Sequence, residues 1–315
     1  MTDITAIGEI LIDLTQTGVS DAGIPVYTAF PGGAPANVAV AAARLGAKTA
    51  FIGKVGNDAF GKLLVDTVSK NGVDASGMIV SDTANTTLAV VSVEESGERD
   101  FAFYRKGFAD TLLDEKEISV KQLKNTRFLH FGSVSLTDEP SRSATLNTAQ
   151  KAKELGAVIT YDPNYRASLW STLKDALYYM SAPLPFVDIL KISDEELVLL
   201  TGVEDAEQGT AILYERYGTP LILVTLGADG AYFRLKNNTG FVEGFKVKVA
   251  DTNGAGDTFF GAFLSCMCRM NKFKPSELSE KEVYRMVLFA NKAASITTSR
   301  SGAIPAMPTI DEVVI

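Results

Sequence analysis

The sequence predicts an α/β protein with a mainly parallel central sheet, helices on both faces of that sheet, and a small β-sheet lid. Two observations lead to this class. Short apolar runs alternate with stretches of helical periodicity through most of the 315 residues, which is typical of parallel strands joined by helices. One region breaks that alternation with strand-like patterning and no helix. No internal repeat or low-complexity linker divides the chain, so we expect residues 1–315 to form a single domain.

The elements of the main sheet follow from these patterns in chain order. The apolar runs that predict buried strands are ITAIGEILIDL (4–14), TAFIGKV (49–55), RFLHFGSV (127–134), VITYDPN (158–164), VDILKIS (187–193) and LILVTLG (221–227). The stretches that predict helices are PANVAVAAARLG (35–46), AFGKLLVDTVSKNG (59–72), SATLNTAQKAKELG (143–156) and DEELVLLTG (194–202). These helical stretches end at glycine, the residue that most easily closes a helix in the left-handed conformation.

The lid is predicted from two segments, about 14–31 and 86–110. In TLAVVSVEESGERDFAFYR (87–105), residue types alternate on either side of a Ser-Gly-Glu turn, which is typical of an antiparallel hairpin. Residues 14–31 are similarly rich in turn formers. We expect the two segments to pair as a small sheet that projects from the core and closes over a bound ligand.

Composition excludes several classes of protein. The chain has 38 acidic and 30 basic residues, a net charge of −8, which argues against nucleic acid as a partner. No apolar window is long enough to span a membrane, and acidic residues interrupt the N-terminal apolar run, unlike a signal peptide. Cys266 and Cys268 lie two apart in an apolar helical stretch and are expected to be reduced packing residues. A cytoplasmic location is the expectation.

The stretch DTNGAGDTFFGAF (251–263) predicts an anion site. Gly254, Ala255 and Gly256 precede an apolar run that begins with Asp257 and has the pattern of a buried helix. The first N–H groups of a helix lack internal partners and lie at the positive end of its dipole, so small residues there leave them open to a phosphate. The same helix terminus is expected to keep Asp257 ionised and only modestly basic.

The stretch PGGAPANVAVAAARLG (31–46) predicts a second point of ligand contact. Gly32 and Gly33 allow close approach of the backbone, and Asn37 offers a donor and acceptors at the start of an alanine-rich helix. A turn of two glycines before a buried helix is an equally good interpretation of this stretch alone. Asp13, at the end of an apolar run, either accepts hydrogen bonds from neighbouring sugar hydroxyls or is a plain turn residue.

Two other patterns predict no nucleotide site. GNDAFGKL (56–63) nearly matches the P-loop, but Leu63 stands where a hydroxyl should hold magnesium, so a helix capped by Asn57 or Asp58 is the better interpretation. GAGDTF lacks the third glycine of the dinucleotide fingerprint. His130, the single histidine, lies in an apolar run and is interpreted as structural or pocket-lining.

Together, PGGAPANVAVAAARLG and DTNGAGDTFFGAF resemble the two hallmark motifs of the ribokinase-like (pfkB) carbohydrate kinases. The likeness continues through GKVGNDAFG, DPNYRASLW, VTLGADGA and FANKAAS and so covers nearly the whole chain. ERDFAFYRKGFADTLL followed by DPNYRASLW looks most like the fructokinases, and 2-keto-3-deoxygluconate kinases have a similar arginine pair. The resemblance implies a ribokinase-like fold and transfer of the ATP γ-phosphoryl group to a sugar hydroxyl.

The resemblance also implies roles for individual residues. Asp257 is the base, and the amides of Gly254, Ala255, Gly256 and Asp257 form the anion hole. The implied sugar-binding residues are Asp13, Gly32, Gly33, Asn37, Arg105 from the lid, and Arg166. Two arginines in one pocket suit an anionic substrate, so a sugar-acid kinase stays open beside the 6-hydroxyl of fructose. A non-catalytic sugar-sensing protein is the alternative of another class.

For the nucleotide, the resemblance implies Thr225, Gly227 and Gly230 around the phosphates and ribose, and Asn291 near the adenine. Magnesium would be held largely by phosphate oxygens and water. Ser193 stands where the family more often has Asn, and Glu196 remains to order a magnesium-bound water. Asp251, Asn253 and carbonyls of 297–302 match a potassium site of many relatives. A homodimer through the lid is also implied for many members, with sugar and ATP as the small-molecule partners.

Overall fold

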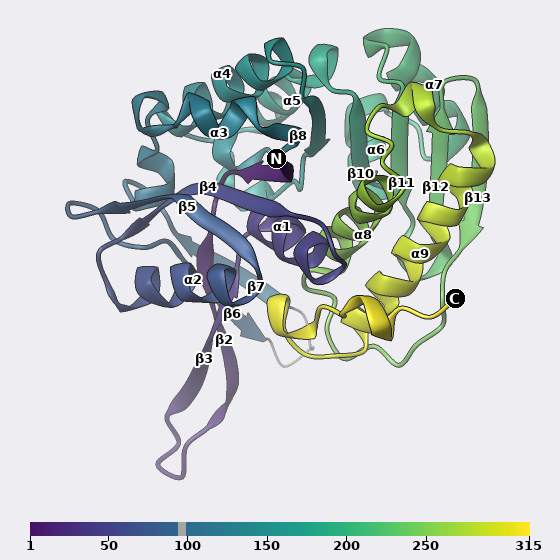
Figure 1. Cartoon of the computed structure of the whole chain (residues 1–315). Helices are drawn as coiled ribbons and strands as arrows, with labels where there is room; N and C mark the ends of the chain where they lie inside the picture. Colours follow the sequence, from purple (N-terminus) through teal and green to yellow (C-terminus); the bar gives the residue numbers. More distant parts are fainter. Residues whose placement is uncertain (94–98) are drawn as a thin grey trace.

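The structure is a computed structural model that describes residues 1–93 and 99–315, and it confirms the predicted α/β class (Figure 1). A nine-stranded sheet has the order β13-β12-β11-β10-β9-β8-β1-β4-β5, and a four-stranded sheet has the order β3-β2-β6-β7. Neighbours in the large sheet are parallel from β5 to β11, while β12 and β13 are added antiparallel. The strands of the large sheet are β1 (Thr2–Ile7), β4 (Thr49–Gly56), β5 (Val73–Ser81), β8 (Thr126–Gly132), β9 (Val158–Asp162), β10 (Ile189–Ser193), β11 (Leu221–Thr225), β12 (Gly230–Leu235) and β13 (Asn238–Glu243).

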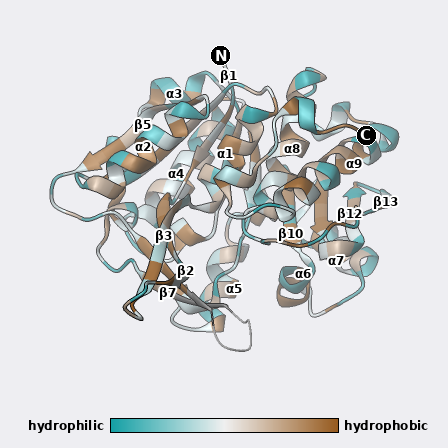
Figure 2. Ribbon diagram, turned by 90° about the horizontal axis from the view of Figure 1, so that it is seen from below, coloured by the Kyte–Doolittle hydropathy of each residue, from teal (hydrophilic) through white to brown (hydrophobic). Residues whose placement is uncertain are grey.

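Helices cover both faces of the large sheet, because successive residues of its strands are buried against opposite layers. In β11, Leu221 and Leu223 belong to the cluster under α8 and α9, whereas Ile222 and Val224 belong to the cluster under α4 to α7. This two-sided burial explains why the strands read as continuous apolar runs. The helices are α1 (Ala34–Arg44), α2 (Ala59–Lys70), α3 (Val120–Lys124), α4 (Ser141–Glu154), α5 (Leu173–Ser181), α6 (Asp194–Thr201), α7 (Ala206–Tyr217), α8 (Ala255–Arg269) and α9 (Glu280–Thr298). Figure 2 shows hydrophilic and hydrophobic residues side by side on outer helices such as α2.

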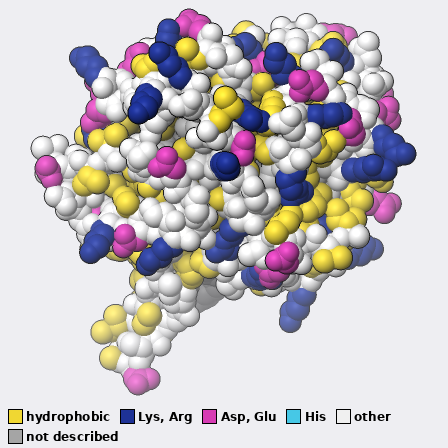
Figure 3. Space-filling model, in the orientation of Figure 1, with side chains coloured by type: hydrophobic (Ala, Val, Ile, Leu, Met, Phe, Trp, Pro, Cys, Tyr) yellow, Lys and Arg dark blue, Asp and Glu magenta, His cyan; other side chains and the backbone are white. Residues whose placement is uncertain are grey.

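The small sheet is built from the two segments predicted to form the lid. Its strands are β2 (Leu11–Val19), β3 (Pro25–Gly32), β6 (Leu88–Val93) and β7 (Arg99–Tyr104). The hairpin of β2 and β3 projects from the body of the molecule and carries hydrophobic side chains toward solvent (Figure 3). Exposed members of that hairpin are Val19, Ile24, Val26 and Tyr27. The Ser-Gly-Glu turn predicted at 96–98 lies outside the described residues.

One strand prediction was wrong. The run at 4–14 forms two strands, β1 and β2, and they belong to different sheets. The chain passes from one sheet to the other at Gly8–Ile10, where Gly8 has a φ of 150°. The apolar pattern continues across this junction because Ile7, Ile10 and Ile12 are all buried, so the pattern alone could not reveal the break.

Smaller predictions about local structure are confirmed. Asp58 caps α2 by accepting a hydrogen bond from the Gly61 amide at 2.8 Å, as expected of the P-loop-like stretch. Both cysteines are free thiols, and burial raises the pKa of Cys266 to about 11 and that of Cys268 to about 12. In the described part of the chain, no helix combines the length and the apolarity needed to cross a membrane.

Candidate active site

A cavity of about 720 Å³ opens between the carboxyl ends of the central strands, the start of α1 and the start of α8. Ligands of open α/β sheets bind at this edge, because the loops that follow the strands meet there. Twelve of the residues singled out in the sequence line the cavity: Asp13, Gly33, Asn37, Arg166, Ser193, Glu196, Thr225, Gly227, Asn253, Gly254, Gly256 and Asp257. The other six, Gly32, Ala255, Arg105, Gly230, Asn291 and Asp251, are not part of its lining.

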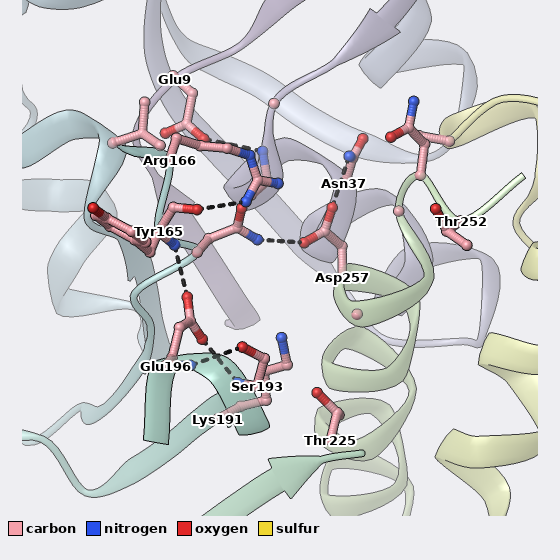
Figure 4. Close-up of a pocket in the computed structure, with 18 of the residues that line it drawn as sticks. Glu9, Asn37, Tyr165, Arg166, Lys191, Ser193, Glu196, Thr225, Thr252 and Asp257 are labelled. Atoms are coloured by element: carbon pink, nitrogen blue, oxygen red, sulfur yellow. Dashed lines mark hydrogen bonds between the residues drawn. The ribbon is translucent and has the colours of Figure 1, made fainter. Parts of the chain in front are cut away.

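Asp257 lies in the first turn of α8 and lines the cavity. Its side chain is 6% exposed, and each carboxylate oxygen accepts a hydrogen bond from an amide group. Nδ2 of Asn37 donates to Oδ2 at 2.8 Å, and Nδ2 of Asn164 donates to Oδ1 at 3.2 Å (Figure 4). The two donors come from α1 and from the loop after β9, so residues far apart in the sequence fix one carboxylate.

The basicity of Asp257 differs from the expectation. Burial, and then the neighbouring charge of Asp162, raise the pKa of Asp257 to about 6, although the Asn37 hydrogen bond and the charges of Lys191 and Arg166 lower it. The expectation of a modest base considered only the helix terminus and missed the loss of solvent around the carboxyl. A carboxylate with this pKa is ionised at neutral pH and is a better proton acceptor than an exposed one.

The turn before Asp257 exposes backbone amides to the cavity. Gly254 caps α8 with a φ of 73°, and a Cβ there would lie 2.9 Å from Cβ of Ala303, so the position requires glycine in both conformation and space. The Ala255 amide contacts the Thr252 carbonyl at 3.3 Å. The amides of Gly256 and Asp257 come too early in the helix to have a helical acceptor. A Cβ on Gly256 would lie 3.0 Å from the ammonium nitrogen of Lys191, so this turn combines open donors with a nearby cation.

The start of α1 also lines the cavity. Gly33 caps this helix with a φ of 109°, and a Cβ there would lie 2.6 Å from the Glu9 carbonyl oxygen. Gly32 lies against the Asp13 carboxylate. Burial raises the pKa of Asp13 to about 7, although Arg166 lowers it. Oδ1 of Asn37 is buried and has no hydrogen-bond partner among the described residues, which leaves an acceptor beside Asp257.

The two predicted arginines lie in different surroundings. Arg105 is 4% exposed and pairs with Asp110 at 2.6 Å, while its other nitrogens contact Thr137, Asp138 and the Val134 carbonyl. Arg166 is exposed and lies along the cavity, where it donates one hydrogen bond, to the Tyr165 carbonyl at 2.9 Å (Figure 4).

The loop that carries Arg166 is held by buried charges. Oε1 of Glu196 accepts the Tyr165 amide at 2.6 Å, and Oε2 accepts the Ser193 amide at 2.8 Å, while Ser193 caps α6 in return (Figure 4). The Lys191 ammonium lies 2.9 Å from Oδ2 of Asp162. Burial alone lowers the pKa of Lys191, but Asp162 and Glu196 outweigh that effect and raise it, so the buried cation stays charged.

The remaining predicted residues lie around this centre. Asn291 donates to the carbonyls of Val242 and Glu243 at 3.0 and 3.1 Å, and Gly230 begins β12 with a φ of 124°. Asp251 accepts the amides of Asn253 and Gly302 at 2.9 and 3.1 Å, which brings it to the predicted 297–302 stretch. No group of three or more His, Cys, Asp or Glu side chains that could hold a metal occurs in residues 1–93 and 99–315.

Comparison with known proteins identifies the family. A model of the pfkB family of carbohydrate kinases matches residues 1–310. The chain belongs to this family. It is a sugar kinase, a phosphotransferase with an alcohol group as acceptor, and its fold is that of the ribokinase-like kinases.

Fructokinases are among the relatives of high similarity. Fructokinase-1 of Zea mays is 42% identical over 312 residues, which cover 98% of this chain and 96% of the relative. A fructokinase from Xylella fastidiosa solved with bound ATP is 31% identical, with a TM-score of 0.91 and coverage of 99% and 96% of the two chains. A double-mutant fructokinase from Vibrio cholerae O395, solved with fructose, ADP and a potassium ion, is 34% identical, with a TM-score of 0.87 and coverage of 98% and 96%.

Several residues of this cavity were missed in the sequence. Glu9, Asn164, Lys191 and Thr252 line the cavity. Lys191 offered a signal, since a lysine within an apolar strand run must find a buried partner. Asn164, with a φ of 49°, is the last residue of the predicted strand run VITYDPN. Glu9 gave no such signal, because its cavity position depends on the break between β1 and β2. His130 is buried, and burial lowers its pKa to about 4, so it is neutral.

Proposed function

We propose that this kinase transfers the γ-phosphoryl group of ATP to the 6-hydroxyl of D-fructose. The observation that carries the proposal is the buried Asp257 carboxylate, oriented by two amide donors directly beside the open amides at the start of α8. The fructokinases among its relatives, including those solved with ATP or with fructose and ADP, support the choice of substrates.

In the proposed reaction, the sugar hydroxyl lies against Asp257, which accepts its proton as the oxygen attacks the γ-phosphorus. A pKa of about 6 keeps Asp257 ionised at neutral pH, so it accepts that proton without a second base. The amides of 254–257 donate to the phosphoryl oxygens, whose charge changes during transfer. Arg166 and Lys191 add positive charge to the lining of the cavity.

The residues present fit a magnesium ion that is held mainly by the nucleotide. Both Glu196 oxygens already accept backbone amides, so this carboxylate can order a metal-bound water more readily than complete a protein cage. Magnesium would supply charge neutralisation for the phosphates when bound. Thr225 and Gly227 are proposed to line the phosphates and ribose, while Gly230 and Asn291 shape the neighbouring β12, β13 and α9. Asp251 and Asn253, with 297–302, are proposed to hold a potassium ion.

The charge distribution favours a neutral ketose over a sugar acid. The guanidinium of Arg105 is already paired with Asp110, so Arg166 is the arginine that faces the cavity. Asp13 and Asp257 line the same cavity. Carboxylates accept hydrogen bonds from sugar hydroxyls and repel the carboxylate of a sugar acid. Asp13, Gly32, Gly33 and Asn37 are therefore proposed to bind the hydroxyls of fructose, with the small sheet closing over them. The exposed apolar face of that sheet is also the proposed dimer contact.

A panel of acceptors tests the proposal. The enzyme is assayed for ADP release with fructose, ribose, 2-keto-3-deoxygluconate and fructose 6-phosphate, and the product is located by ³¹P–¹H coupling. We expect fructose to give the highest kcat/KM and a phosphate on carbon 6. Preference for the sugar acid would favour the alternative substrate class. Fructose binding without ADP release from any acceptor would indicate a sugar-sensing protein.

A further inference from the structure

The junction between the two sheets is pressed against the start of α1. Gly8, Glu9 and Ile10 connect β1 of the large sheet to β2 of the small one. A Cβ on Gly8 would lie 2.8 Å from Cγ of Pro35, and a Cβ on Gly33 would lie 2.6 Å from the Glu9 carbonyl oxygen. No side chain fits between the junction and the helix, so the two backbones are in direct contact.

Glu9 also acts as the cap of α1. The N-cap position is Gly33, which has no side chain to accept a hydrogen bond, and no side-chain cap comes from within the helix. Instead, Oε1 of Glu9 accepts the Ala34 amide at 3.0 Å. The Glu9 side chain is 3% exposed, so water does not replace it easily. A residue 25 positions earlier in the chain thus satisfies one of the unpaired amides of the first turn, as a serine or aspartate cap does for the next amides of other helices.

Hydrogen bonds of Asn37 connect the capped turn of α1 to Asp257. The Asn37 amide donates to the Gly33 carbonyl at 2.9 Å, so Asn37 is set by the same first turn that Glu9 holds. Nδ2 of Asn37 then donates to Asp257 at 2.8 Å. A shift of the helix start would therefore move the donor that orients the carboxylate.

Glu9 is linked to the small sheet as well. Its Oε2 atom is buried and has no hydrogen-bond partner among the described residues. Burial raises the pKa of Glu9 to about 7, while the charge of Arg105, which follows β7, lowers it and that of Asp110 raises it. The charges of the Arg105–Asp110 pair therefore act on the carboxyl group that caps α1.

We propose that Glu9 is a positioning residue that holds the start of α1 and acts on catalysis through Asn37. This proposal about Glu9 rests on the proposed function only because it takes Asp257 as the base. In this proposal Glu9 acts through the start of α1 and not by contact with sugar or nucleotide. Its required property is an oxygen acceptor at the Ala34 amide, not a negative charge.

The first experiment compares three variants with the acceptor sugar and nucleotide that the wild-type enzyme uses most efficiently. Glu9→Gln keeps the acceptor, and we expect its kcat/KM to stay within about threefold of wild type. Glu9→Asp withdraws the oxygen by one methylene, and Glu9→Ala removes it. We expect kcat/KM for the sugar to fall about 10- to 100-fold in Glu9→Ala, the range for small misplacements of reacting groups, and less in Glu9→Asp. KM for the nucleotide should not change.

A matched control separates positioning from general loss of a helix cap. Asp205 caps α7 by accepting the Gln208 amide at 2.8 Å, and it does not line the cavity. Asp205→Ala should lower Tm and leave kcat/KM within twofold of wild type. If Glu9→Ala does not fold, the difference between Glu9→Gln and Glu9→Asp decides. A loss in Glu9→Gln as large as in Glu9→Asp would overturn the proposal.

A double-mutant cycle tests the route through Asn37. If Glu9 acts by placing Asn37, the losses in Glu9→Asp and Asn37→Ala should not add, so the double variant should match Asn37→Ala within about twofold. Multiplication of the two losses would overturn the proposal. The proposed fructokinase function would fail separately, if the wild-type enzyme preferred another acceptor sugar. In that case the double-mutant cycle is measured with the preferred acceptor.

Discussion

The end of β7 and the loop after β9 each bring one arginine close to the cavity, and the two regions use it differently. Arg105 is surrounded by acceptors: Asp110, Thr137, Asp138 and a carbonyl. Arg166 donates only to the Tyr165 carbonyl among the described residues and faces the cavity. Burial with fitted partners makes the first a structural ion pair, whereas the second keeps donors for a ligand. The surroundings of an arginine, not its presence near a motif, indicate its role.

The largest effect is expected at Asp257, the group to which Arg166 is coupled. Asp257→Asn removes the proton acceptor, and we expect kcat to fall by about three orders of magnitude or more. The fold should survive, since the amide replaces the carboxylate with almost no change of volume. Steady-state kinetics and a circular dichroism spectrum check this. Turnover close to wild type would refute the role of Asp257. The effects of the two arginines could then no longer be interpreted as effects on this base.

Next in size is the loss of stability when Arg105 is removed. Arg105→Met leaves Asp110, 5% exposed, without its cation. Breaking a buried pair in this way costs about 3–5 kcal/mol of unfolding free energy, which chemical denaturation measures. Arg105→Met with Asp110→Asn should recover part of the loss. Unchanged stability with a raised KM for the sugar would instead make Arg105 a sugar-binding residue.

Arg166 should give the opposite pattern. Arg166→Gln removes a charge that faces the cavity and has no acidic partner in a salt bridge among the described residues. We expect kcat/KM to fall about tenfold, roughly 1.4 kcal/mol, with Tm within 2 °C of wild type, since exposed substitutions change stability little. Separate titrations of sugar and ATP show which substrate it contacts. A large drop in Tm would show that Arg166, like Arg105, mainly stabilises the fold.

The smallest expected effect is a change in the pH dependence of kcat/KM, which should differ between the Arg166 and Arg105 variants. Asp257 must be ionised to accept a proton, so kcat/KM should be constant above its pKa of about 6 and fall as pH drops below it. The charge of Arg166 lowers that pKa. Arg166→Gln should therefore move the acid limb of the profile to higher pH. If the acid limb of the Arg105→Met profile moved by the same amount, both arginines would act on Asp257.

Most of the fold could be predicted because its strands and helices carry their own signals. The runs that became β4, β8, β9, β10 and β11 are apolar on both faces, and the predicted helices end at glycines with positive φ such as Gly46 and Gly202. The junction at Gly8–Ile10 could not be predicted. Its residues are as buried as those of the strands on either side, and the apolar pattern of Ile7, Ile10 and Ile12 runs through it despite Glu9. Only pairing with distant strands separates β1 from β2.

The site divides in the same way. Local sequence patterns alone were enough to predict Asp257, Gly254 and Asn37 as site residues, because each lies at the start of a helix that follows a glycine-rich turn. Arg105 could not be assigned, because its acceptors come from 110 and 134–138. Periodicity also gave no indication that burial would raise the pKa of Asp257, since that effect depends on everything packed around the carboxyl.

The two cysteines in α8 have a practical consequence. With pKa values of about 11 and 12, Cys266 and Cys268 hold almost no thiolate at neutral pH, and the thiolate is the form that maleimides attack. A cysteine introduced at Ile24, which is 63% exposed at the tip of the projecting hairpin, should therefore be labelled first. A fluorophore attached there would report opening and closing of the small sheet without prior removal of the native thiols.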